Sequence, residues 1–249
     1  MTRKTDPATA HRPLFLAALA ALAALCGFLG GWALQHTPIG EARANALVRS
    51  YILEHPEILP EAMERLQARE MNARLAPMRA EVATPFPGAV LGNPKGTRVL
   101  VEFSDYACGY CRQSLADVEA LIAADPQLKV VIREYPILSP ESLTAARMAL
   151  AAAEQGKFAA FHKAMFATGR PSPATIRAAA GKAGLDMPRA EKVAASPAVE
   201  TELRRTMQMA EALGFSGTPS WVAGGEALAG TVGRERLAAA LKKAEPQRQ

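Results

Sequence analysis

The residues best suited to chemistry are two cysteines three positions apart, Cys108 and Cys111, in the stretch DYACGYCR. The chain has three cysteines in 249 residues, and the third, Cys26, lies in an apolar run near the N-terminus. Two cysteines one helical turn apart can close a disulfide ring with little backbone movement. At the start of a helix, backbone N–H groups and the helix dipole stabilise a thiolate. The pattern therefore predicts a redox-active pair, with Cys108 as the nucleophile and Cys111 as the resolving thiol.

Other uses of the pair are open from the spacing alone. A zinc site needs two more ligands, and the candidates His55 and His162 are single residues far apart in the sequence. A purely structural disulfide would close so short a loop that it could hardly stabilise the fold. A non-enzymatic module that binds Cu(I) through both thiolates is a further alternative, because soft thiolates suit this ion. We favour redox chemistry and expect no cofactor or metal beyond the Cys108–Cys111 disulfide itself.

The segments around the pair predict the elements that position it. TRVLVEFSDYA is rich in β-forming residues, CGYCRQSLADVEALIAAD begins a helix with one apolar face, and LKVVIREY is a second strand. The two strands of such a βαβ unit are parallel, and functional groups lie where the C-terminal end of a strand meets the next helix. The cysteine pair is predicted at that junction.

Helices and a hairpin are predicted in the rest of this domain. Over residues 139–214, three Ser-Pro pairs each supply a capping hydroxyl and a proline for the first helical turn, and glycines mark the helix ends. PSWVA, the turn Gly224-Gly225 and EALAG predict a hairpin, and a last helix follows around RERLAAALKKA. The order of elements predicts the α/β class, as a thioredoxin-like fold with an inserted helical subdomain over about 139–214.

The N-terminal part of the chain predicts export. Residues 1–13 are a basic tail, and residues 14–34 are an uncharged run about as long as a bilayer-spanning helix. We expect a cytoplasmic tail followed by an inner-membrane anchor, with a cleaved signal peptide as the alternative. Either reading places the cysteine pair in the periplasm or cell envelope, where thiols form disulfides. The formal net charge of +5 does not indicate nucleic-acid binding.

A helical segment separates this run from the main domain. Residues 38–83 predict two helices broken near His55-Pro56, followed by a Pro/Gly-rich boundary at residues 84–96. Apolar residues recur along both helices at helical spacing, and such a face must be buried somewhere. The partner is either the main domain, which we place at residues 87–249, or a second copy of the same helices. The pattern leaves both open.

Several separated motifs resemble the DsbA-like branch of the thiol-disulfide oxidoreductases, from about Pro87 to the end of the chain. In order they are EFSDYACGYC, IREYPILSPES, EQGKFAAFHKAMF, AGLDM and GFSGTPSWV. The resemblance implies a thioredoxin fold that acts on thiols and disulfides of exported proteins. It also implies a membrane or periplasmic redox partner, which the sequence does not identify.

The resemblance assigns roles to individual residues. Cys108 and Cys111 match the family's catalytic pair. Thr218-Pro219 matches a threonine or valine followed by a cis-proline, in a loop that faces the pair and binds the backbone of an extended substrate. Glu102 matches a partly buried carboxylate beneath the active site, where it raises the pKa of a thiol or relays a proton. A strand glutamate that points to solvent is the alternative.

The sequence departs from the family in the residues between the cysteines. These are Gly109 and Tyr110, whereas strongly oxidising members have Pro-His, whose imidazole helps to hold the thiolate. We therefore expect Cys108 to be a less acidic thiol and the pair to be less oxidising than DsbA, whose potential is about −120 mV. Isomerase, oxidase and reductase activity all remain open.

The N-terminal helices carry a second, shorter resemblance. The stretch VRSYILEHPEILPEAMERLQ is similar to ScsC-like proteins, a DsbA-like group tied to copper-stress tolerance. Some members of that group assemble through this region. The resemblance therefore implies a homo-oligomer through residues 38–83, with several Cys108 sites around a shared space.

Overall fold

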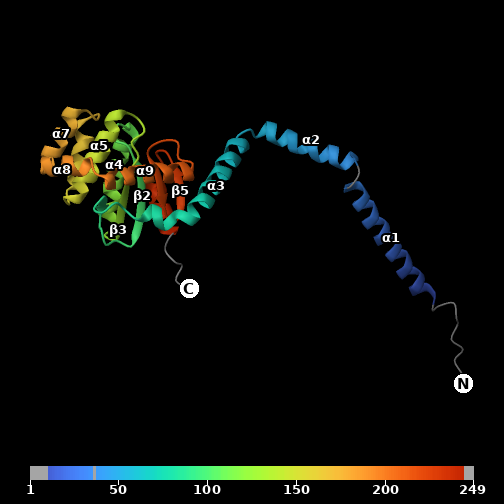
Figure 1. Ribbon diagram of the computed structural model, residues 1–249. Coiled ribbons are helices and arrows are strands. Elements are labelled where there is room, and N and C mark those ends of the chain that lie inside the picture. Colours follow the sequence, from blue (N-terminus) through green and yellow to red (C-terminus); the bar gives the residue numbers. More distant parts are fainter. Residues whose placement is uncertain (1–10, 36–37, 244–249) are drawn as a thin grey trace, which may run out of the picture. The chain divides into compact units, whose positions relative to one another are not determined.

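The computed structural model describes residues 11–35 and 38–243, and the chain divides into two units, Met1–Glu64 and Arg65–Gln249 (Figure 1). The first unit contains α1 (His11–Gln35), α2 (Pro38–Glu54) and the beginning of α3 (Ile58–Ala83). The predicted break near His55-Pro56 is confirmed, since α2 ends just before it. Proline has no N–H to donate, and it disfavours helical backbone at the residue before it.

The described part of the first unit bears on the predicted membrane anchor. Helix α1 covers residues 14–34, whereas residues 1–10 of the predicted cytoplasmic tail lie outside the described residues. Among the residues that the structure describes, no helix combines the length and the apolar character needed to cross a membrane.

The second unit is built on a five-stranded sheet. Its strands are β1 (Val90–Gly92), β2 (Arg98–Ser104), β3 (Leu128–Glu134), β4 (Ser220–Ala223) and β5 (Glu226–Ala229), in the order β1-β3-β2-β4-β5. Strands β2 and β3 are parallel and the other pairs are antiparallel, which confirms the predicted βαβ unit and hairpin. Strand β1 was not predicted, because three residues within a Pro/Gly-rich stretch are too few to show a β pattern.

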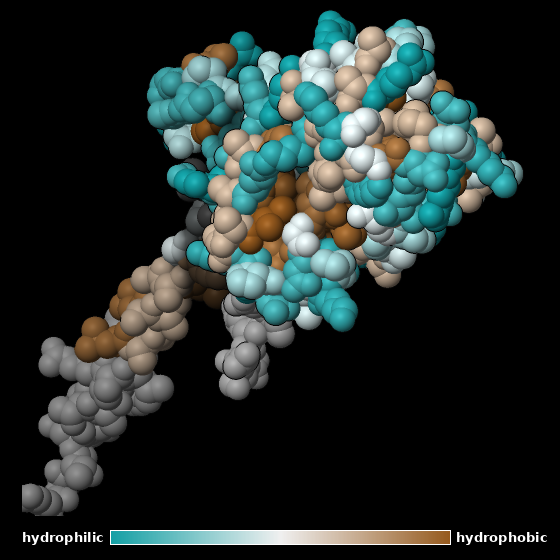
Figure 2. Space-filling view, turned by 90° about the vertical axis from the view of Figure 1, so that its left-hand side faces the viewer, coloured by the Kyte–Doolittle hydropathy of each residue, from teal (hydrophilic) through white to brown (hydrophobic). Residues whose placement is uncertain are grey.

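The described part of this unit also contains the helices α4 (Gly109–Ala124), α5 (Pro140–Glu154), α6 (Phe158–Thr168), α7 (Pro173–Lys182), α8 (Met187–Ala194), α9 (Pro197–Leu213) and α10 (Gly233–Lys243). Ser139, Ser172 and Ser196 cap α5, α7 and α9 through their side chains, as predicted. Helices α5, α7 and α8 gather at one side (Figure 1) and line a hollow with an apolar floor. The space-filling view of that side shows apolar residues in a hollow bordered by hydrophilic ones (Figure 2).

The sheet is covered on both faces, which gives a thioredoxin-like α/β fold with a helical insertion. One face packs against α4, α5, α6 and α10, and the other packs against α9 and the second half of α3. Leu75 and Val82 of α3 are fully buried there. The sequence predicted a domain boundary at residues 84–96, but the compact unit begins at Arg65 because these two side chains complete its core.

Candidate active site

Cys108 lies where β2 leads into α4, as the pattern predicted. It is the N-cap of α4, with extended backbone. Its Sγ accepts the backbone N–H of Cys111 at 3.4 Å, and its thiol donates to the carbonyl oxygen of Thr218 at 3.2 Å. Backbone N–H groups at a helix start stabilise negative charge on a sulfur that attacks or leaves. Both cysteines of the pair are free thiols in this structure.

Both cysteines of the pair are buried. Cys108 is 5% exposed and Cys111 is 1% exposed. Burial and the nearby carboxyl of Glu102 raise the pKa of Cys111 far above its ordinary value. Cys111 therefore needs a base before it can attack a mixed disulfide.

The loop that faces Cys108 contains Thr218 and Pro219. The peptide bond between them is cis, in agreement with the family resemblance. The hydroxyl of Tyr135, at the end of β3, donates to the carbonyl oxygen of Phe215 at 3.2 Å and holds the start of this loop. Among the described residues, the Cys108 thiol is the donor to the carbonyl oxygen of Thr218, so this oxygen becomes a free acceptor when Cys108 loses its proton. An extended substrate could then donate a backbone N–H to it.

Glu102 lies in the middle of β2, opposite Ile132 of β3 and Trp221 of β4. Its side chain is 3% exposed, so the alternative of a solvent-facing glutamate is wrong. Burial raises the pKa of Glu102 to about 8, although the neighbouring hydroxyl of Ser104 opposes part of this increase. A carboxyl group that titrates near neutral pH can accept a proton from Cys111 and return it.

Asp105 organises the turn that carries the pair. Its Oδ1 accepts the N–H of Ala107 at 2.8 Å, and its Oδ2 accepts the N–H groups of Ile137 and Leu138, both at 2.9 Å. The turn before Cys108 and the loop after β3 are therefore fixed to one carboxylate. The sequence analysis did not identify this residue.

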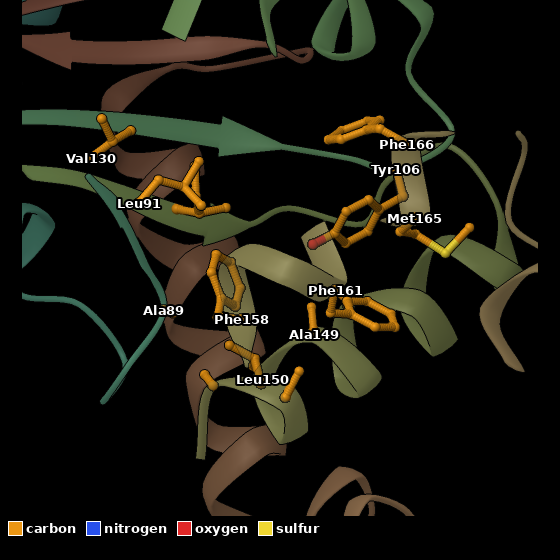
Figure 3. Close-up of a cluster of buried hydrophobic side chains, with 14 of the residues drawn as sticks. Ala89, Leu91, Tyr106, Val130, Ala149, Leu150, Phe158, Phe161, Met165 and Phe166 are labelled. Atoms are coloured by element: carbon orange, nitrogen blue, oxygen red, sulfur yellow. The ribbon is translucent and has the colours of Figure 1, made fainter. Parts of the chain in front are cut away.

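A second group of buried polar residues also escaped the sequence analysis. The hydroxyl oxygen of Tyr106 lies 3.0 Å from Oε1 of Glu134 and 3.0 Å from Nδ1 of His162. The ring of Tyr106 packs among Phe161, Met165 and Phe166 (Figure 3). A histidine on the apolar face of the stretch FAAFHKAMF was the available signal, since such a residue must be buried.

The residues between the cysteines are Gly109 and Tyr110. Gly109 is the first residue of α4 and has open space where a side chain would be, and the side chain of Tyr110 is exposed. The effect of this dipeptide on the redox potential stays a prediction.

The histidines considered as metal ligands have other partners. His55 lies 3.2 Å from the carboxylate of Glu57, and His162 contacts Tyr106. Across residues 11–35 and 38–243, no group of three or more His, Cys, Asp or Glu side chains is arranged to hold a metal ion.

A helix-capping cysteine pair on a βαβ unit, faced by the loop of Thr218 and Pro219, is an arrangement of the thioredoxin-like fold. Residues 99–242 match the DSBA-like thioredoxin domain, and the chain belongs to this family. Residues 41–73 match the copper resistance protein ScsC N-terminal domain. Both resemblances seen in the sequence are therefore confirmed.

Solved structures agree with this assignment. A thioredoxin-like oxidoreductase from Silicibacter pomeroyi DSS-3 is 41% identical, and the match covers 62% of this chain and 90% of that chain with a TM-score of 0.60. Proteus mirabilis ScsC in a transitional conformation is 25% identical, and the match covers 84% of this chain and 96% of that chain with a TM-score of 0.62.

A curated relative shares only part of its length with this chain. The Na(+)/H(+) antiporter NhaA 1 of Salinispora arenicola (strain CNS-205) is 28% identical over 158 residues, which are 62% of this chain and 24% of that protein. The chain therefore spans about a quarter of the length of the curated relatives it matches.

Proposed function

We propose that the protein exchanges disulfides with exported proteins through Cys108 and Cys111, in the oxidising environment of the cell envelope. The observation that carries the proposal is the position of the Cys108 sulfur. It caps α4 and contacts the carbonyl oxygen of Thr218 in the facing loop. One sulfur is thus placed both for thiolate chemistry and next to a backbone acceptor for a substrate.

The exchange follows from the burial of the two sulfurs. In the oxidising direction, a substrate thiolate attacks Sγ of Cys108, the bond between Cys108 and Cys111 breaks, and the Cys111 sulfur leaves with the electron pair. Glu102 donates a proton to that sulfur. A second substrate thiolate then attacks the substrate sulfur of the mixed disulfide, which leaves an oxidised substrate and the Cys108 thiolate. The substrate loses two electrons and the cysteine pair gains them.

Isomerisation uses the same atoms from the reduced state. The Cys108 thiolate attacks a wrong disulfide, and one substrate sulfur leaves as a thiolate. That thiolate then attacks another substrate disulfide bond, and the final attack on the mixed disulfide releases Cys108 unchanged. If the substrate stalls, Cys111 gives its proton to ionised Glu102 and attacks Cys108, which releases the substrate in reduced form.

Reactivation of ribonuclease with scrambled disulfides tests the proposal and separates the directions. The reduced protein restores ribonuclease activity if it is an isomerase, and the Cys108→Ala variant does not. If the reduced protein has no effect but its disulfide form rapidly oxidises reduced ribonuclease, the protein is an oxidase. Failure of both reactions in the wild type would refute the proposed function. Glu102→Gln is expected to slow the steps that involve Cys111 about 10²-fold, the usual size of a general acid–base contribution.

The first unit supports a proposal of self-association. In residues 41–64 of this unit, six large apolar side chains are at least half exposed: Leu47, Val48, Tyr51, Leu53, Leu59 and Met63. Exposed apolar residues on helices are typical of a surface that another chain covers. Because α1 also exposes apolar residues, light scattering of the wild type should be compared with a Leu47→Lys/Met63→Lys variant. We expect an oligomer that this variant dissociates, and equal masses would contradict the proposal.

Binding of Cu(I) is a second candidate function with narrower support. It rests on the description of the domain that matches residues 41–73. Titration of the reduced protein with Cu(I) tests it. Glu102→Gln keeps both sulfurs, so Cu(I) should still bind with the same stoichiometry while disulfide exchange slows.

A further inference from the structure

Glu134, Tyr106 and His162 lie in one line of contacts between β3, the turn before Cys108, and α6. The Tyr106 oxygen is 3.0 Å from Glu134 Oε1 and 3.0 Å from His162 Nδ1. Each of the three residues is about 2% exposed, so water cannot easily replace either hydrogen bond. The middle residue of the line, Tyr106, precedes Cys108 by two residues.

The number of protons available to these two hydrogen bonds links the tautomer of His162 to the protonation state of Glu134. Two hydrogen bonds need two protons, and the Tyr106 hydroxyl supplies one. If Glu134 is a carboxylic acid, it donates to Tyr106, Tyr106 donates to Nδ1 of His162, and the neutral ring carries its proton on Nε2. If Glu134 is a carboxylate, it accepts from Tyr106, and His162 must donate from Nδ1. An Nε2–H tautomer of His162 therefore requires a proton on Glu134.

The surroundings decide between the two arrangements. Phe158 stacks on the His162 ring with centroids 5.6 Å apart, and Phe166 meets it edge-on at 5.0 Å. Burial in this apolar shell lowers the pKa of His162 to about 3. The ring is therefore neutral at physiological pH, and it offers Glu134 no positive charge.

The groups that face Glu134 are acidic or neutral. Burial raises the pKa of Glu134 well above its ordinary value. The hydroxyl of Tyr106 opposes part of this increase, and the negative charges of Asp105 and Glu102 add smaller increases. The cation next to it in the sequence, Arg133, pairs with Glu202 on the other face of the sheet. A neutral Glu134 satisfies the whole line without a buried charge.

We propose that Tyr106 and His162 hold Glu134 as a neutral acid, and that this makes Glu134 and His162 positioning residues for the reaction of the cysteine pair. Their role is to keep a second negative charge away from Glu102, which lies on the same face of the sheet.

The consequence rests on the proposed function. Cys111 gives its proton to Glu102 when it resolves a mixed disulfide, so Glu102 must be ionised beforehand. A charged Glu134 would oppose that ionisation, since like charges on neighbouring strands raise the pKa of each other. A neutral Glu134 lets Glu102 lose its proton at lower pH, so that more of the enzyme can react near pH 7.

Nitrogen NMR of the ¹⁵N-labelled full-length protein tests the line itself. His162→Phe identifies the signals of this ring among the four histidines of the chain. We expect the Nε2–H tautomer from pH 5 to pH 8, and the same tautomer in Glu134→Gln, because a glutamine amide also donates to Tyr106. An Nδ1–H tautomer in the wild type that changes to Nε2–H in Glu134→Gln would overturn the proposal.

The rate at which Cys111 resolves a mixed disulfide, measured against pH, tests the positioning role. Glu134→Gln should leave the profile unchanged within about twofold in rate. In His162→Phe, Tyr106 donates to Glu134 and favours its carboxylate. The profile should then move to higher pH and the rate at pH 7 should fall by about tenfold.

A double variant supplies the matched control. His162→Phe/Glu134→Gln cannot carry the charge, so its profile should return to that of the wild type. If the double variant stays as slow as His162→Phe, the loss is structural and the positioning role is wrong. The NMR result does not depend on catalysis, so failure of the proposed function would leave the protonation line standing.

Discussion

Strands β2 and β3 carry buried ionisable residues on both faces of the sheet. On one face these residues have no partner of opposite charge among the described residues, and on the other face the charge is paired. Glu102 and Glu134 point to the face covered by α4, α5 and α6, and neither has a cation as a hydrogen-bond partner among the described residues. Arg133 points to the other face, where α3 and α9 pack. It donates to the carboxylate of Glu202 at 2.5 Å and to the carbonyl oxygens of Glu81, Val82 and Thr84.

Neighbouring residues on a strand point to opposite faces of the sheet. Arg133 therefore contributes to stability on one face, and Glu134, the next residue, lies with the reactive groups on the other. Burial lowers the pKa of Arg133, but an arginine keeps its charge in proteins, and here each of the three guanidinium nitrogens donates to an acceptor. The acids on the opposite face have few donors around them, so burial makes them neutral and leaves them able to titrate. The paired charge of Arg133 holds the end of α3 against the sheet, whereas Glu102, which has no cation as a partner among the described residues, can hold a proton close to Cys111.

Removal of the paired charge should have the largest effect on stability. Arg133→Met leaves Glu202 without its partner and the last carbonyl groups of α3 without donors. We expect a loss of about 3 to 5 kcal/mol in the free energy of unfolding, the usual cost of breaking a buried pair from one side. Urea denaturation of the two proteins at the same pH measures it.

An exposed pair in the same region is the control. Arg205 contacts Glu81 of α3 at 2.7 Å, with both side chains 43% exposed. Arg205→Met should cost at most about 1 kcal/mol, because surface pairs contribute little. Equal losses in the two variants would mean that the burial of Arg133 does not set its role.

Removal of an unpaired acid should have the opposite sign, and its size should depend on pH. The pKa of Glu102 is raised to about 8 in the folded protein, so its contribution is intact at low pH. It is lost as the pH rises through this value, because the unfolded chain releases the proton first. Glu102→Gln should therefore become more stable relative to the wild type by up to about 4 kcal/mol between pH 5 and pH 8. Urea titrations across this range measure the difference, and a constant offset would show that Glu102 is ionised in the folded state.

The sequence predicted the reactive face only in part. Cys108 and Cys111 follow from spacing and from the βαβ pattern, and Glu102 follows from the family resemblance. Tyr106 and His162 are 56 positions apart, and their contact depends on how the inserted helices pack against the sheet. A pattern of apolar residues can indicate that His162 is buried, but it does not name the partner that satisfies the ring.

The helices before the domain show the same limit. Apolar residues recur with helical spacing over residues 44–52 and again over residues 71–82. The structure buries Leu75 and Val82 of the second stripe against the sheet, while Leu47 and Tyr51 of the first stripe are exposed. The spacing of apolar residues indicates that one face of a helix is apolar. It does not indicate what covers that face, since this depends on residues far away in the chain.

Asp105 is intermediate between the paired Arg133 and the unpaired Glu102, because it is a buried acid that accepts hydrogen bonds from backbone N–H groups. Its two oxygens accept three backbone N–H groups. Asp105→Asn keeps the shape of the side chain but replaces one carboxylate oxygen with an amide NH₂ group, which then faces at least one N–H donor. We expect a loss of about 1 to 3 kcal/mol in thermal or urea unfolding. Asp186→Asn is the matched control, since Asp186 caps α8 at the surface and asparagine caps equally well. A harmless Asp105→Asn would show that water can replace these bonds.

The smallest expected effect comes from the start of α4, where a substitution alters neither face of the sheet. Gly109 is the first helical residue, its side-chain position is open, and Cys108 before it has φ −78° and ψ 119°. Proline suits this position, because its fixed φ fits a first helical residue and the extended backbone of Cys108 tolerates it. Gly109→Pro should stabilise the protein by about 0.4 to 1 kcal/mol through a less flexible unfolded chain.

The sign of the stability change in Gly109→Pro tests whether the start of α4 acts on the cysteine pair independently of the buried acids. Gly214 is the contrasting glycine, since its φ of 77° is a conformation that residues with a side chain rarely adopt, and Gly214→Ala should lower the melting temperature. If Gly109→Pro also lowers it, the N–H of Gly109 holds the Cys108 sulfur or the turn before it. If the melting temperature rises and the pH profile of Cys111 is unchanged, the helix start and Glu102 act on the pair independently.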